Sequence, residues 1–126
     1  MNTEQFITKI REKIIAGTSF TKVYSSELPS GESNVCAVGI VAGLTNNDLT
    51  NYGYSTITFR VLIRGNESDL DTRGLCDEVF DTLHLLQNID LTDGRIINIT
   101  GSTPVFVRKD ENQRYIYNIT FDCNVR

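Results

Sequence analysis

His84 is the only histidine of the 126-residue chain, and it follows Asp77 and Asp81 at spacings of seven and three. On a helix these spacings place the three side chains on one face, where they could form a histidine–aspartate dyad or part of a metal site. A zinc site requires three or four nitrogen or sulfur ligands, and no cysteine has the spacing to join. A catalytic triad would need a nucleophile in an elbow such as G-x-S-x-G, which the sequence lacks. We therefore expect a solvated acidic helix face with no metal, no cofactor and no enzymatic activity.

A second candidate for chemistry is the junction in "RVLIRGNESDLDTRGLCDEVFDTLHLL" (60–86), where an apolar strand passes through Gly65 into an amphipathic helix. Such junctions bind phosphate in some proteins, but G-x-x-x-x-G-K-[ST] and G-x-G-x-x-G are both absent. Ser68 is the expected N-cap, Asp71 completes a capping box and Asp69 lies beside it. These carboxylates occupy the positive end of the helix dipole and would repel a phosphate. The junction predicts a helix start and no phosphate site.

Basic and aromatic residues alternate around the last turn that the pattern predicts. The basic residues are Arg108, Lys109 and Arg114, and the aromatic ones are Phe106, Tyr115 and Tyr117. Such residues on a sheet can stack and neutralise a nucleic acid. Asp110 and Glu111 separate the basic residues, however, and the RNA-recognition octamer is absent. A salt-bridged hairpin with tyrosines on its packed face is the favoured interpretation, and a small nucleic-acid-binding domain is the remote alternative.

Length and composition set broad limits. A chain of 126 residues with 40% apolar residues can bury a core as one domain, residues 1–126, without a disulfide or metal. The net charge of −4 argues against polyanion binding by the whole surface. The start of the sequence does not resemble a signal peptide, and the longest apolar stretch, "VCAVGIVAGL", is too short to span a bilayer. We expect a soluble cytoplasmic protein whose three cysteines are buried thiols.

The order of elements follows from the periodicity of apolar residues and predicts α-β-β-β-α-β-β-β. The helices are expected at 3–16 and about 69–87. The strands are expected at 19–24, 35–42, about 56–64, 95–100, 104–109 and 114–125. This order indicates an α+β domain, with two helices packed on a largely antiparallel sheet of about five to six strands. Because so few strands cannot close a barrel, the sheet should present an edge that can pair with another chain.

The second half of the sequence resembles the tail terminator proteins, also called tail-completion or minor capsid proteins, of long-tailed bacteriophages and prophages. The resemblance covers about residues 54–125: "ITFRVLIRG", the helix "LCDEVFDTLH", and "LTDGRIINITGSTPVFVRKDENQRYIYNITFDCNV". A hairpin of the form P-x-F-x-x-x-D-E-x-x-R-Y is matched by Pro104, Phe106, Asp110, Glu111, Arg114 and Tyr115. Another head–tail connector adaptor is the nearest alternative.

This resemblance implies a homo-hexameric ring with no catalytic role. The ring would cap the tail tube, stop its polymerisation and present a surface to the head completion or connector protein. DNA would pass through the ring without specific binding, and no membrane would be involved. The protein would assemble in the host cytoplasm and remain in the virion at the head-proximal end of the tail.

Two hypotheses name contact residues. The polar segment 43–53 is longer than a tight hairpin needs, so we expect it to contact tail subunits through Asn46, Asn47, Asp48 and Tyr52. An acidic channel would repel the passing DNA, because phosphate binding requires cations. The candidate lining is the acidic face of the second helix, with Asp77, Glu78 and Asp81.

Overall fold

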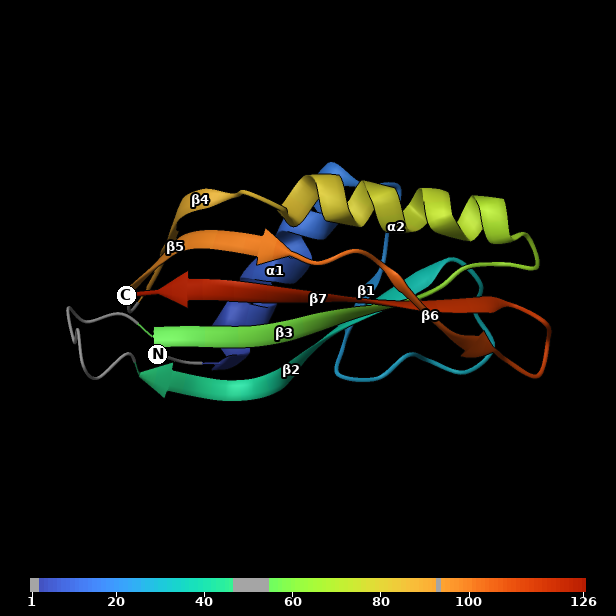
Figure 1. Ribbon diagram of the computed structural model, residues 1–126, viewed down its shortest axis with the longest axis horizontal. Coiled ribbons are helices and arrows are strands. Elements are labelled where there is room, and N and C mark those ends of the chain that lie inside the picture. Colours follow the sequence, from blue (N-terminus) through green and yellow to red (C-terminus); the bar gives the residue numbers. More distant parts are fainter. Residues whose placement is uncertain (1–2, 47–54, 93) are drawn as a thin grey trace.

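Two helices cover one face of a curled, mixed sheet of seven strands (Figure 1). The computed structural model describes residues 3–46, 55–92 and 94–126. In chain order the elements are α1 (Thr3–Gly17), β1 (Val23–Ser25), β2 (Val35–Asn46), β3 (Ser55–Arg64), α2 (Asp69–Leu83), β4 (Gln87–Leu91), β5 (Gly94–Gly101), β6 (Val105–Lys109) and β7 (Tyr115–Val125). The expected α+β class is confirmed, with β4 as a strand that the sequence pattern did not predict.

The strands lie in the order β1-β2-β3-β7-β5-β4, and β6 also pairs with β7. Residues 121–125 of β7 pair with β5, whereas residues 115–118 pair with β6, so β5 and β6 follow one another along β7. The pairing of β1 with β2 is parallel and all the others are antiparallel. The sheet is therefore largely, but not purely, antiparallel.

The core lies between the helices and alternate residues of the central strands. Every second residue of β3 from Ile57 to Ile63, and of β7 from Tyr117 to Val125, is buried, as the period of two predicts. The ring of Phe59 stacks on Phe121 at 5.1 Å and meets the edge of Phe6 from α1 at 5.4 Å. These contacts hold α1 on the sheet, and the buried residues Cys76, Val79 and Leu83 of α2 belong to the same core.

The second helix begins where its cap predicts but ends four residues early. Ser68 is the N-cap and its hydroxyl accepts the N–H of Asp71. In a full capping box the Asp71 carboxylate would accept the N–H of Ser68. That part of the prediction is wrong, because the N–H of Ser68 donates to the Asn66 side chain at 2.8 Å. The helix stops at Leu83 because Leu85 adopts a left-handed conformation with φ of 68° and donates its N–H to Ile99 of β5.

The face of the sheet opposite the helices carries a ladder of polar side chains that bond to one another. Asn124 accepts a hydrogen bond from Thr56 at 3.1 Å and donates one to Asn98 at 2.9 Å. Asp122 accepts the hydroxyl proton of Thr58 at 2.8 Å. Neighbouring strands β3, β7 and β5 are thus linked by side chains as well as by backbone.

The three cysteines are free and buried, as expected, and burial raises the pKa of each thiol to about 12. Within the described ranges, no helix has the length and apolar character needed to cross a membrane.

Candidate interaction surface

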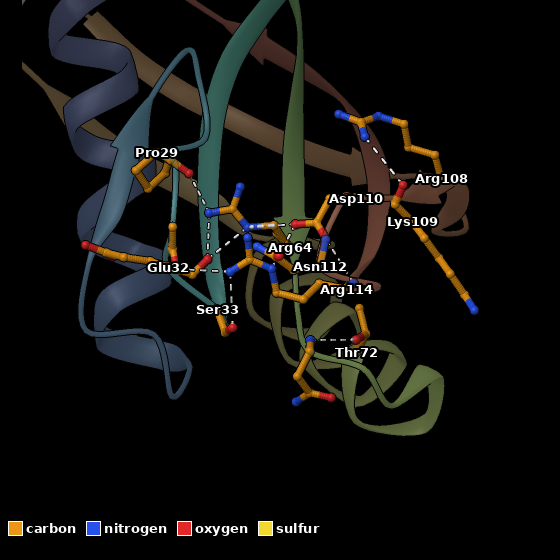
Figure 2. A network of polar contacts seen from close by, with 12 residues as sticks. Pro29, Glu32, Ser33, Arg64, Thr72, Arg108, Lys109, Asp110, Asn112 and Arg114 are labelled. Carbon is orange, nitrogen blue, oxygen red and sulfur yellow. Dashed lines mark hydrogen bonds and ion pairs between the residues drawn. The ribbon is translucent and has the colours of Figure 1, made fainter.

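Two buried arginines hold together three segments that are far apart in the sequence (Figure 2). Arg64 ends β3, and its guanidinium donates to the backbone carbonyls of Pro29 and Glu32 in the loop between β1 and β2. Arg114, just before β7, donates through Nη1 to the carbonyl of Gly31 in the same loop at 3.1 Å. Both guanidinium groups therefore fix loop 26–34 against the end of the sheet.

Asp110 is the carboxylate that both arginines share. Its Oδ2 accepts Arg114 Nε at 2.8 Å and lies 3.8 Å from Arg64 Nε, while Oδ1 accepts the backbone N–H groups of Asn112 and Arg114 at 2.9 Å. Desolvation alone would raise the pKa of Asp110, but these hydrogen bonds and the charge of Arg114 together hold that pKa below its usual value. The turn between β6 and β7 is thus locked by a charged side chain on its inner side.

The locked turn presents β6 as an exposed strand. All five residues of β6 are exposed, and three of them are consecutive apolar residues: Val105 (60% exposed), Phe106 (50%) and Val107 (48%). Phe106 nevertheless has a defined position, because its ring lies 5.9 Å from that of Tyr115 and 5.7 Å from that of Tyr117. A run of exposed apolar residues on a rigid edge strand is typical of an interaction surface.

The edge of the sheet at β1 is partly covered by contacts within the chain. The carbonyl of Val23 in β1 accepts Arg11 Nε at 2.7 Å, and that of Ser25 accepts the N–H of Glu27. β2 extends past β1, and its pairing with β3 is irregular at two places, between residues 40 and 42 and between 42 and 45. Such features discourage pairing with other chains. The opposite edge strand, β4, has no run of apolar residues, so β6 is the strand that exposes such a run among the described residues.

A groove of about 600 Å³ lies between α2 and the segment that leads into β6. Its α2 side includes Leu70, Gly74 and Asp77, and its opposite wall includes Pro104 and Tyr117. The hydroxyl of Tyr117 donates to the carboxylate of Asp69, which accounts with desolvation for the rise of the Tyr117 pKa to about 12. The groove and the apolar run of β6 together form the candidate surface, called the β6 surface below.

The tail-contact residues expected in segment 43–53 fall mostly outside the described residues. Asn46 is the last residue of β2, whereas Asn47, Asp48 and Tyr52 lie in the segment that the structure does not describe. Their role stays a prediction.

The expected acidic face of α2 is divided by its contacts. Asp77 and Asp81 are exposed, and Asp77 borders the groove. Glu78 instead accepts the backbone N–H of Ser19 at 2.8 Å and its hydroxyl at 3.2 Å, which ties α2 to the end of α1. Two of the three acidic side chains are therefore exposed, and the expected lining of a channel stays a prediction.

His84 does not share the acidic helix face that its spacing suggested. It is the C-cap of α2, its ring stacks on Phe80 at 4.6 Å, and its Nδ1 accepts the N–H of Gly101 at 2.9 Å. No group of three His, Cys, Asp or Glu side chains that could hold a metal occurs among the described residues. His84 thus joins α2 to β5.

Sequence reasoning identified the Asp110–Arg114 turn but missed Arg64 and loop 26–34. The alternation of β3 places Arg64 on the face opposite the helices, where the residue pattern gives it no partner. The loop, whose contacts to Arg64 are made through backbone carbonyls, buries it together with Asp110. Backbone acceptors leave no signal in side-chain patterns, so this contact could not be found from residue types.

The fold is that of a small α+β protein, and the β6 surface is an exposed apolar patch of the kind at which proteins bind other proteins. A family model described as bacteriophage tail terminator protein matches residues 7–126, and the chain belongs to this family. It is therefore a tail-associated structural protein of phage type.

The fold is also found in a solved virion. A chain from the structure titled "Virion of native gene transfer agent (GTA) particle" aligns with a TM-score of 0.68 and 13% identity, over 98% of this chain and 96% of that one. No curated protein matches the sequence. At this identity, the structural match shows a shared fold.

Proposed function

We propose that the protein terminates the phage tail: a ring of identical subunits, most simply a hexamer, caps the tail tube, stops its polymerisation and offers the joining surface to the head connector. The family match over nearly the whole chain carries this proposal. The exposed and rigid β6 surface supports it, because a ring subunit must contact neighbours through preformed patches.

The proposal assigns the protein no reaction. Its surfaces bind other subunits by shape complementarity. The subunits bind to growing tail tubes in the host cytoplasm before the virion is completed. DNA passes through the ring unbound, and we propose that Asp77 and Asp81 turn toward this channel, where like charge repels phosphate. Segment 43–53, through Tyr52 and its polar neighbours, is the proposed contact with the tail tube.

Tail length tests the function directly. Deleting the gene from its phage or prophage should give tails of uncontrolled length without attached heads, measured by electron microscopy, and the wild-type gene should restore normal particles. Adding the purified protein to polymerising tail tube protein should likewise limit tube length. Normal, DNA-filled particles from the deletion strain would refute the function. The Tyr52→Ala variant should bind tubes more weakly while its unfolding transition stays unchanged.

A head–tail connector adaptor is the alternative within the same class of protein. Pull-down experiments separate the two, since a terminator binds tail tube protein and an adaptor binds the head connector. A nucleic-acid-binding role would instead give salt-sensitive binding to DNA or RNA. That role has little support, because Arg114 is bonded to Asp110 and Lys109 Nζ lies 4.8 Å from the ring centre of Tyr115.

A further inference from the structure

Gly74 is a glycine that no contact among the described residues explains. It lies in the middle of α2, is exposed, and a Cβ atom there would meet no atom within 4 Å. Glycine in a helix interior is less stable than alanine. Gly74 also lines the groove, one turn after Leu70, whose side chain is 75% exposed. A bare helix backbone at this place allows another molecule to approach closely.

Leu85 is the opposite case, a large side chain where glycine would be favoured. It follows the C-cap of α2 and has a φ of 68°. Glycine is favoured at this position because it adopts a positive φ without the steric cost that a side chain adds. Its side chain is 65% exposed, and its one described bond, to Ile99, uses the backbone N–H that glycine would also have. Contacts within the protomer therefore do not account for the leucine.

The exposed apolar residues of the protomer divide into one cluster and three separate residues. Leu70, Val105, Phe106 and Val107 belong to the β6 surface, whereas Ile15, Val41 and Leu85 lie elsewhere among the described residues. Of these three, only Leu85 has an unfavourable backbone conformation. Among the described residues outside the β6 surface, it is thus the exposed apolar residue whose position the protomer's own contacts explain least.

We propose that Leu85 of one copy inserts into the groove over Gly74 of the next copy. The inference rests on the proposed ring, and it names the contact between its subunits. The groove lies along the first half of α2 and Leu85 just past its other end, so the two patches cannot meet within one protomer (Figure 1). The contact is head-to-tail, which is the kind that closes into a ring when the rotation fits.

The apolar run of β6 borders the groove and would pack around the inserted segment. Arg73 and Asp77 line the α2 side of the groove, and Asp81, which is exposed, lies one turn further along the helix toward Leu85. Asp81 can therefore face a channel beside the apolar contact.

Cross-linking tests the head-to-tail contact in the full chain. Gly74→Cys and Leu85→Cys variants are prepared separately and then mixed under mild oxidation. Cys36 and Cys123 are buried and do not line the groove, and Cys76, which lines it, is replaced by alanine in both variants. We expect a disulfide-linked dimer of one variant with the other in the mixture and none from either variant alone. A mixture of Gly74→Cys with Ile15→Cys is the matched control and should not cross-link.

Two further variants separate contact from folding. Gly74→Ala and Leu85→Gly should each raise the melting temperature of the protomer and weaken self-association by about tenfold or more in sedimentation velocity, since each removes one side of the fit. Leu85→Asp should abolish association, whereas Ile15→Asp should leave it unchanged. Because Gly74→Ala and Leu85→Gly should keep the fold, a loss of association in these two variants cannot be attributed to unfolding.

Several results would overturn the proposal. These are a wild-type protein that stays monomeric at all concentrations, a Gly74→Cys dimer formed alone, no cross-link in the mixture, or undiminished association of Gly74→Ala. The proposed function and the proposed contact can be refuted independently. Cross-linked rings that do not limit tube length would refute tail termination but not the contact. Limited tubes without the Gly74–Leu85 cross-link would refute only the contact.

Discussion

Replacing Asp110 by alanine should destabilise the protein strongly, because it leaves two buried arginines without their carboxylate. The change removes three hydrogen bonds of 2.8–2.9 Å and the ion pair with Arg64. Removing one member of a buried pair costs about 3–5 kcal/mol. The side chain of Asp110 is 10% exposed, so we expect a loss near the lower limit, about 3 kcal/mol.

Urea unfolding followed by circular dichroism measures this loss. With a slope of about 2 kcal/mol per molar, the midpoint should fall by about 1.5 M. Asp110→Asn keeps the two backbone bonds and loses the charge, so its loss should be about half as large, since charge-assisted bonds are about twice as strong as neutral ones. Glu111→Ala, an exposed neighbour in the same turn, is the control and should change stability by no more than about 0.5 kcal/mol.

The pH dependence gives a second check on the same carboxylate. Because the folded-state pKa of Asp110 is lowered, its stabilising effect is fully present above the unfolded value of about 4 and is lost as pH falls through the folded pKa. The stability difference between wild type and Asp110→Asn should therefore be constant above about pH 5 and shrink below it. A loss under about 1 kcal/mol for Asp110→Ala, or a difference independent of pH down to about 2, would refute the reasoning.

Gly65→Ala should destabilise by about 1–3 kcal/mol in urea unfolding, because its Cβ would lie 2.1 Å from the Thr72 hydroxyl oxygen; wild-type stability would show that the helix start can shift. Tyr117→Phe should cost about 1–2 kcal/mol by losing the bond to Asp69. Since the pKa of Tyr117 is raised to about 12, that difference should hold below pH 10 and vanish as pH rises toward 12. The native thiols should react with a thiol reagent only after unfolding; rapid reaction of the folded protein would contradict their burial.

Long, strongly patterned elements were predictable from the sequence. In β3 and β7 the alternation of apolar residues matched the buried face, and Ser68 marked the start of α2. The residue pattern did not predict elements whose conformation depends on tertiary contacts. β4 contains one buried residue, Ile89, and exists because it pairs with β5, a contact that its polar sequence does not reveal.

The candidate surface was predictable only in part, for a similar reason. The Asp110–Arg114 turn is local in sequence and could be recognised, whereas Arg64 depends on a loop more than thirty residues away. The end of α2 was placed too late because leucine at position 85 gives no stop signal, although its backbone is left-handed. That residue breaks a local rule, and such exceptions are where function is expected.

The polar ladder on the open side of the sheet affects where other proteins can bind the protomer. Its threonine, asparagine and aspartate side chains form hydrogen bonds with one another. This face therefore offers few unpaired polar groups to other proteins. The exposed apolar area of the described residues is concentrated on the β6 surface, so contact with other subunits is directed to that part of the molecule and away from the open face of the sheet.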